Sequence, residues 1–168
     1  RGDESNRTHQ THATTMHASD AMSKGKWTFK PGARVEYISG EYWNGDRTDD
    51  GVDNGDRDYA VIVGGGSLKY DVYDVDGRDL DLFAGVHRGF SPAAPRSSLR
   101  DGLREETSLG FEVGTRYANA KRAFASEVIF FHTYIDDLII NDSVGGTGSG
   151  NTVNGGEVRT LGLEMQAN

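Results

Sequence analysis

Residues 27–37 read WTFKPGARVEY, a run in which apolar and polar side chains alternate. Successive side chains of an extended strand point to opposite faces, so this alternation predicts a β-strand with one apolar and one charged face. The apolar face would carry Trp27, Phe29, Ala33, Val35 and Tyr37, and the charged face Thr28, Lys30, Arg34 and Glu36.

The same period of two recurs along the chain. In residues 108–117, SLGFEVGTRY, four apolar side chains alternate with polar ones, and residues 158–166 repeat the pattern with Leu161, Leu163 and Met165. We therefore predict an all-β fold of about seven strands. The four less regular strands are expected at residues 11–22, 61–73, 80–90 and 123–135.

The connections between these strands alternate in length. Three are short and carry Gly, Asn or Asp, the residues that supply positive φ angles in hairpins: 23–26, 75–78 and 118–121. Three are long and polar: 40–58, 91–104 and 141–157. Short turns at one end and long loops at the other are typical of an outer-membrane barrel. We expect an antiparallel up-and-down meander that forms part of a transmembrane β-barrel.

Composition narrows the possible functions. The 168 residues contain no cysteine, which excludes disulfides and thiolate metal sites, and the net charge of −8 argues against nucleic acid as a partner. A mean hydropathy of −0.61 is compatible with a barrel, in which only every second strand residue faces lipid. Because the chain starts at Arg1 and stops inside a strand pattern at Asn168, we expect a segment of a longer polypeptide.

Residues 82–92, LFAGVHRGFSP, place a His-Arg pair at the end of an apolar strand. In a barrel, Leu80, Leu82, Ala84 and Val86 would face lipid, and Asp79, Asp81 and His87 would face the lumen. Arg88 would then reach the outer rim, although a bulge could turn it inward, and both side chains could instead form ion pairs with neighbouring strands. Pro92 ends the strand because it has no N–H to donate.

Five stretches, taken in order, resemble a known family. They are KWTFKPGARVEY (26–37), LFAGVHRGFSP (82–92), GLREETSLGFEVGTRY (102–117), FFHTYIDDLI (130–139) and NGGEVRTLGLE (154–164). Together they resemble the barrel of TonB-dependent outer-membrane receptors, of the ferric dicitrate or siderophore type. Such receptors have roughly twenty-two strands around an N-terminal plug. The resemblance therefore implies that residues 1–168 are one partial barrel, without the plug and the remaining strands.

The resemblance implies a function in active transport. The parent protein would bind and import a ferric chelate, ferric citrate or a siderophore, at the bacterial outer membrane. The TonB complex would supply the energy through the plug, and outer-membrane lipid would surround the barrel. This implies no enzymatic step and no cofactor.

Ferric citrate is an anion, and the planar guanidinium of arginine forms bidentate bonds with carboxylates. The candidate substrate contacts are therefore the cationic residues of the long loops and the His-Arg pair, although loop arginines are often only solvated. They are His87, Arg88, Arg96, Arg100, Arg104, Arg47 and Arg57.

Another class of protein is compatible with part of the pattern. A soluble extracellular β-sandwich could bind calcium or carbohydrate through its long loops, and the acidic run DDGVDNGDRD (49–58) could wrap a cation although it lacks EF-hand spacing. A sandwich would bury the apolar strand faces that a barrel exposes.

Two site hypotheses lack geometric support. One is a histidine metal site at His9, His12 and His17, and the other is a hydrolase site at Ser126, His132, Asp136 and Asp137.

Overall fold

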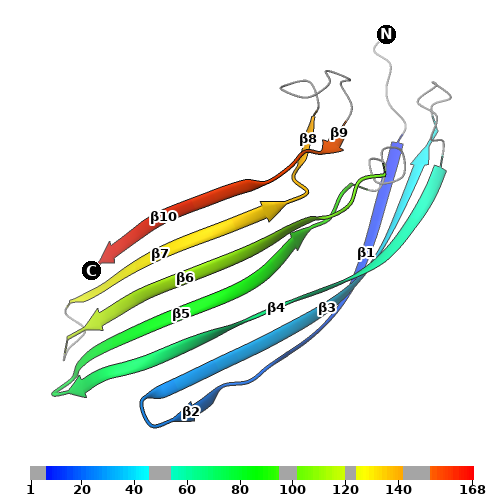
Figure 1. Ribbon diagram of the computed structural model, residues 1–168. Helices are drawn as coiled ribbons and strands as arrows, with labels where there is room; N and C mark the ends of the chain where they lie inside the picture. The colour runs from blue at the N-terminus through cyan, green and yellow to red at the C-terminus, as the bar shows by residue number, and fades with distance from the viewer. Residues whose placement is uncertain (1–6, 46–53, 95–101, 120–123, 142–151) are drawn as a thin grey trace.

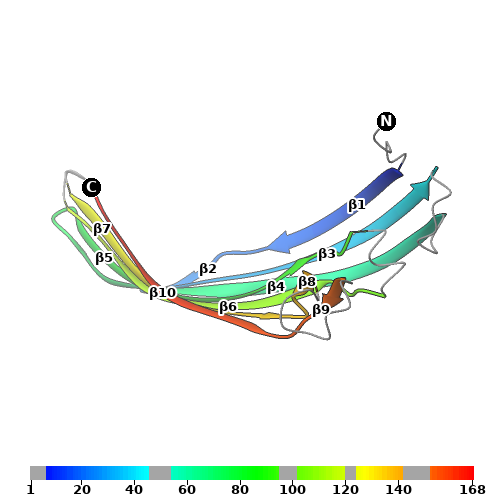
Figure 2. The ribbon, with the colours of Figure 1, turned by 90° about the horizontal axis from the view of Figure 1, so that it is seen from above.

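The computed structural model describes residues 7–45, 54–94, 102–119, 124–141 and 152–168. Figure 1 shows long strands lying side by side in one layer, and Figure 2 shows that this layer is curved. The main sheet contains β1 (Arg7–Ser19), β2 (Met22–Lys24), β3 (Trp27–Asn44), β4 (Asn54–Val75), β5 (Arg78–Ser91), β6 (Glu106–Ala118), β7 (Ala125–Asp136) and β10 (Val158–Ala167). A separate two-stranded sheet pairs β8 (Ile139–Asn141) with β9 (Thr152–Asn154).

The strands follow one another in space in the order β1-β3-β4-β5-β6-β7-β10, and all neighbours are antiparallel. This order confirms the predicted all-β up-and-down meander. Two of the predicted tight turns have the expected left-handed backbone. Gly25 has a φ of 61°, and Asp76 and Gly77 have φ values of 52° and 69°, which suits a type I′ hairpin.

Several predicted boundaries are wrong. The predicted loop at 141–157 contains the short strand β9. The predicted loop at 40–58 is shorter, because β3 and β4 remain paired as far as Trp43 and Asn54. The predicted first strand is interrupted at Asp20 and Ala21, where the Asp20 amide donates to the Pro31 carbonyl at 3.2 Å. Proline has no N–H to return a bond, so the ladder with β3 breaks at this point.

The pairing register assigns every strand residue to one of two faces. Direct cross-strand partners share a face. The face that we call outer carries the row Phe29, Leu68, Ala84, Val113, Phe130 and Leu163. The face that we call inner carries the row displaced by one residue: Lys30, Ser67, Gly85, Glu112, Phe131 and Gly162.

The apolar side chains of the outer face are exposed. Leu161 keeps 68% of its surface and Val113 54%, and the same holds for Trp27, Phe29, Leu109, Phe111 and Leu163. Within the described residues, therefore, no second sheet covers this face, and the sandwich alternative is wrong. No described helix combines the length and hydropathy needed to cross a membrane.

A small buried cluster lies at the other side of the sheet, near the long-loop ends of the strands. Ile38, Val61 and Val63 belong to the inner face of β3 and β4, and Leu103 comes from the segment between β5 and β6. All four are at most 7% exposed. The segment after β5 is thus packed onto the inner face, which brings loop residues next to the sheet.

Candidate functional site

Arg57 is the one described arginine among the sequence candidates that lines a cavity on the inner face. It lies on β4 opposite Gly40, two residues before Tyr59, on the inner face at the long-loop end. Its Nη1 donates to the Leu103 carbonyl at 2.9 Å, and its guanidinium carbon lies 6.0 Å from the centroid of the Tyr59 ring. The guanidinium is therefore oriented by a loop carbonyl and an aromatic ring.

A cavity of about 150 Å³ lies beside Arg57. Its lining residues come from three strands and the loop after β5: Thr11, Ile38, Gly40, Arg57, Tyr59, Pro92, Ala93 and Ala94. The Tyr59 hydroxyl is buried and has no hydrogen-bond partner among the described residues. Burial raises the pKa of this phenol, and the Glu105 carboxylate raises it further, so Tyr59 stays a neutral donor. An oxygen-rich ligand arm would supply the acceptor that Tyr59 lacks.

Arg104 is already engaged by the protein. Its Nη2 bonds to Asp137 Oδ1 at 2.7 Å, while two-thirds of its side chain stays exposed. Its backbone N–H donates to Asn154 Oδ1 at 2.9 Å, and its carbonyl accepts from Asn154 Nδ2 at 3.1 Å. Arg104 is thus fixed beside the β8–β9 hairpin rather than free in solvent.

His87 and Arg88 lie on opposite faces. His87 pairs with Gly110 on the inner face, and its ring lies over that glycine so closely that an added Cβ would come within 2.4 Å of the ring. Arg88 pairs with Leu109 on the outer face, and the register of β5 with β6 is continuous there, without a bulge. The structure therefore does not bring Arg88 together with the inner-face candidates.

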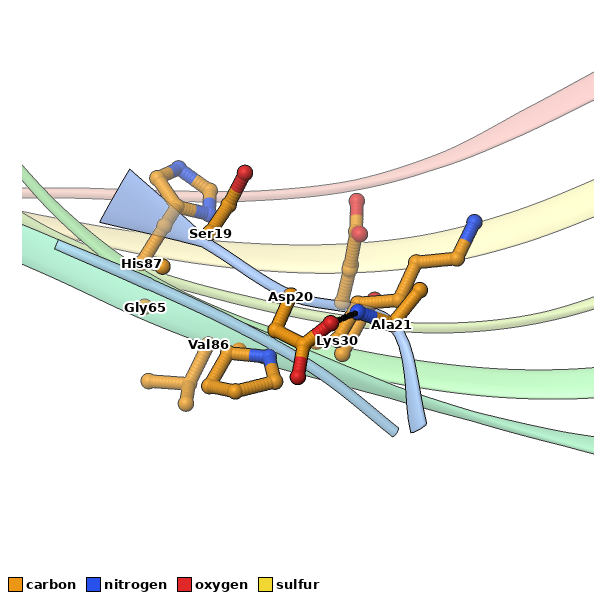
Figure 3. A pocket seen from close by; sticks show the side chains of 13 residues that line it. Ser19, Asp20, Ala21, Lys30, Gly65, Val86 and His87 are labelled. Carbon is orange, nitrogen blue, oxygen red and sulfur yellow. Dashed lines mark hydrogen bonds between the residues drawn. The ribbon is translucent and has the colours of Figure 1, made fainter. Parts of the chain in front are cut away.

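A hollow of about 600 Å³ adjoins His87 on the inner face (Figure 3). The hollow exists because β3, β4 and β5 each place a glycine here, which has no side chain to fill the space. These glycines are Gly32, Gly65 and Gly85. Lys30, Asp20 and Glu112 add charges of both signs around it. His87 pairs with Gly65, eight residues along β4 from Arg57, which is about 26 Å of strand. His87 and Arg57 therefore belong to separate places on the inner wall.

Three of the predicted arginines, Arg47, Arg96 and Arg100, lie outside the described residues, as do Asp49 to Asp53 of the acidic run. In the described ranges, no three His, Asp or Glu side chains gather as metal ligands. Ser126 and His132 stand six residues apart on β7, about 20 Å along the strand, which is beyond hydrogen-bond reach.

Sequence reasoning missed Tyr59 and Asn154. Tyr59 lies two positions after Arg57 on β4, so both side chains lie on the same face of the strand. The period-two spacing could have indicated this, but residues 40–58 were assigned to a loop. Asn154 begins an Asn-Gly-Gly stretch that indicates a turn, and its partners are about 50 residues away at Arg104 and 17 away at Asp137.

Comparison with known proteins gives one family match. The family model described as TonB dependent receptor-like, beta-barrel, matches residues 2–168. No curated protein matches the sequence.

Solved structures share the fold. The ferric citrate transporter FecA in its unliganded form superposes with a TM-score of 0.79 over 99% of this chain at 21% identity. The ferric-catecholate import receptor Fiu from K12 E. coli gives 0.74 over 96% at 14% identity. The alcaligin outer-membrane receptor FauA from Bordetella pertussis gives 0.68 over 96% at 16% identity. The chain spans 24%, 26% and 27% of these three proteins, respectively, about a quarter of each.

Proposed function

The chain belongs to the TonB-dependent receptor β-barrel family, and from this premise we propose that it forms part of the wall of an outer-membrane receptor that imports a ferric chelate. The observation that supports this most is the contrast between the two faces of a single-layered sheet. An exposed apolar outer face and a polar, glycine-rich inner face are what a water-filled barrel in lipid requires.

The outer face has the height of a bilayer. On β3 its apolar side chains run from Trp27 to Tyr37, and the polar residues Ser39 and Glu41 follow on the same face. Residues 27–37 match the roughly 9 to 11 residues with which a tilted strand crosses the hydrocarbon core. Arg88, on the same face above Val86, would lie where a cation can reach lipid headgroups.

The ligand would bind at the long-loop end of the inner face. Arg57 offers a guanidinium, Tyr59 a buried hydroxyl without a partner, and Arg104 a second cation on the adjoining loop. These groups suit the carboxylate or catecholate oxygens of a ferric chelate. The arginines at 47, 96 and 100 would add to this surface from the loops, and His87 would line the wall further in.

Transport itself would involve no covalent chemistry. Binding of the chelate would bias the loops and a plug that the parent receptor carries, and the TonB complex of the inner membrane would supply the work to open a path. The part of the barrel wall that this chain forms would contribute the binding surface and the contact with lipid. The energy from the TonB complex would be transmitted through the plug.

The test is the binding of ferric citrate and of a ferric catecholate to the complete receptor that carries this segment, purified in detergent. We expect Arg57→Ala to weaken binding of the preferred chelate about tenfold or more, because a charged hydrogen bond to the ligand is lost, and Arg57→Lys to recover only part of it. Arg116→Ala is the matched control, since this inner-face arginine sits at the short-turn end, paired with Glu127. Equal affinity of Arg57→Ala and wild type would contradict the assigned site, and a wild-type receptor that binds no chelate would contradict the function.

A further inference from the structure

One side chain joins two loops that are far apart in the sequence. Asn154, at the end of β9, accepts a hydrogen bond at Oδ1 from the Arg104 amide at 2.9 Å. Its Nδ2 donates to the carbonyls of Arg104 at 3.1 Å and Asp137 at 2.7 Å. The carboxamide therefore bonds to three backbone groups, on the loop after β5 and on the chain between β7 and β8.

Two further contacts cross the same interface. The Arg104 guanidinium bonds to the Asp137 carboxylate at 2.7 Å, and the Ile139 amide donates to Glu106 Oε1 at 2.7 Å. We call these five hydrogen bonds the Asn154 clasp. Four of them join Arg104 and Glu106 on one side to Asp137, Ile139 and Asn154 on the other, and the fifth joins Asn154 to Asp137.

The β8–β9 hairpin needs such a support. Each of its strands has three residues, and an isolated two-stranded hairpin is marginal in water. The hairpin is extended by bonds from the Gly155 amide to the Leu138 carbonyl at 2.6 Å and from the Leu138 amide to the Gly156 carbonyl at 3.3 Å. Asp137, with a φ of 57°, turns the chain out of β7 into the hairpin, in a backbone region that Asp tolerates better than most residues. The hairpin is joined to the sheet at both ends, because β7 and β10 on either side of it pair at Ile135 and Val158. The clasp adds the bonds that tie it sideways to the loop after β5.

The clasp also extends to the candidate ligand site. Leu103, the residue before Arg104, is 3% exposed and accepts the hydrogen bond from Arg57 at its carbonyl. The two-residue segment Leu103-Arg104 is therefore held on one side by β4 and on the other by the hairpin. A displacement of the hairpin would disturb Arg104 directly and, through Leu103, one of the contacts that orient Arg57; the Tyr59 ring is another.

We propose that Asn154 is a positioning residue that locks the β8–β9 hairpin to the loop after β5, so that Arg57 and Arg104 are presented to the ligand in one fixed arrangement. The inference rests on the proposed function for its ligand, whereas the clasp itself does not depend on it. Asn154 would not touch the chelate. Its contribution would be preorganisation, which improves affinity by reducing the ordering that binding has to bring about.

The first measurement is amide hydrogen exchange, followed by mass spectrometry, on the complete receptor without ligand. Asn154→Ala removes all three side-chain bonds, and Asn154→Asp keeps the acceptor but loses both donated bonds. Thr152→Ala, in the same hairpin and outside the clasp, is the matched control. We expect the Ile139 amide to exchange about tenfold faster or more in Asn154→Ala, less so in Asn154→Asp, and unchanged in Thr152→Ala.

The Ile139 amide is the decisive probe because Glu106, and not Asn154, accepts its hydrogen bond. If Asn154→Ala only removed the bonds of Asn154 itself, hydrogen exchange would become faster at the Arg104 amide alone. That result would overturn the clasp. If Asn154→Ala does not assemble, the comparison of Asn154→Asp with wild type decides the same question, since the loss of two donated bonds still predicts faster exchange at Ile139.

The second measurement is the Kd for ferric citrate of the same variants at equal amounts of folded receptor. We expect Asn154→Ala to bind about three- to tenfold more weakly and Thr152→Ala like wild type. Faster exchange with an unchanged Kd would overturn the positioning role while leaving the clasp. A wild-type receptor that binds neither ferric citrate nor a ferric catecholate would overturn the proposed function and the positioning role with it, and the exchange data would still decide the clasp.

Discussion

The two faces of the sheet differ although their residues alternate along the same strands. The outer row from Phe29 to Leu163 has six apolar members, whereas the inner row displaced by one residue has Lys30, Glu112 and two glycines among its six. Backbone, strand length and hydrogen bonding are common to both. The difference therefore reflects the surroundings of each face, which in the proposed barrel are lipid on the outer side and water on the inner side.

The inner face also differs in how its aromatic rings pack. Phe83 lies over Gly114 and Phe131 over Gly162, each so close that a Cβ added to the glycine would lie 2.5 Å from a ring carbon. Rings that cover the glycines of a neighbouring strand lie flat on the sheet. Charged inner-face residues are paired as well, as in Lys69 with Asp71 and Arg116 with Glu127. In this part of the inner wall the rings lie flat and the charges are paired, in contrast to the projecting side chains outside.

The largest effect that would separate the faces is a charge placed on neighbouring residues of β6. Phe111→Arg puts a guanidinium on the outer face, where it costs roughly 2–4 kcal/mol near the bilayer midplane. Glu112→Arg puts the same group on the wet inner face and serves as the control. We expect Phe111→Arg to reduce strongly the amount of folded receptor in the outer membrane and Glu112→Arg to leave it near wild type. Equal assembly of both variants would contradict the assignment of the faces.

A smaller effect would separate two glycines of the inner face. A Cβ at Gly65 would lie 2.3 Å from the Val86 carbonyl oxygen, whereas a Cβ at Gly32 finds its nearest neighbour at an ordinary 3.6 Å. We expect Gly65→Ala to destabilise the barrel by about 1–3 kcal/mol. Gly32→Ala should be neutral or stabilising by up to about 1 kcal/mol, because alanine has less freedom in the unfolded chain.

Thermal unfolding of the complete receptor in detergent, followed by the loss of its folded band in unheated gels, measures both substitutions. The expected order of midpoints is Gly32→Ala at or above wild type and Gly65→Ala clearly below it. The reverse order would mean that β4 and β5 do not approach as closely as the pairing of Gly65 with His87 places them.

Much of the fold could be predicted from the sequence because period-two alternation is a local property. The pattern predicts that Leu82 and Val86 share one face of β5 and that His87 lies on the other, and the register confirms this. It also predicts the turns at Gly25 and Gly77. Arg88 remained open in the sequence because a bulge would have reversed its direction. The uninterrupted register of β5 with β6 decides that it lies on the outer face.

The remainder depends on contacts between distant residues. The break at Asp20 arises from Pro31 on the neighbouring strand, and the bulge between Asp71 and Tyr73 from the pairing with β5. The Asn154 clasp joins residues that lie 17 to 50 positions apart, and its polar members look like ordinary loop residues in the sequence. Local pattern gives no signal for such contacts, so the part of the candidate site at Asn154 could not be predicted. Tyr59 differs, because its period-two spacing from Arg57 is a local signal that the assignment of 40–58 to a loop concealed.

The most direct test of the account is the accessibility of β6 in a bilayer. The chain contains no cysteine, so single spin labels can be attached at residues 109, 111, 112, 113, 115 and 116 of the complete receptor, provided that the rest of the receptor is also free of reactive cysteine. Gly110 and Gly114 are left out, because a side chain there would clash with the His87 and Phe83 rings. We predict that collision with oxygen, which concentrates in lipid, is high at the odd positions and low at the even ones. Collision with a water-soluble nickel chelate should show no such preference for the odd positions. Oxygen accessibility that is uniform along the strand, or highest at the even positions, would contradict the claim that the face carrying Leu109, Phe111 and Val113 contacts lipid.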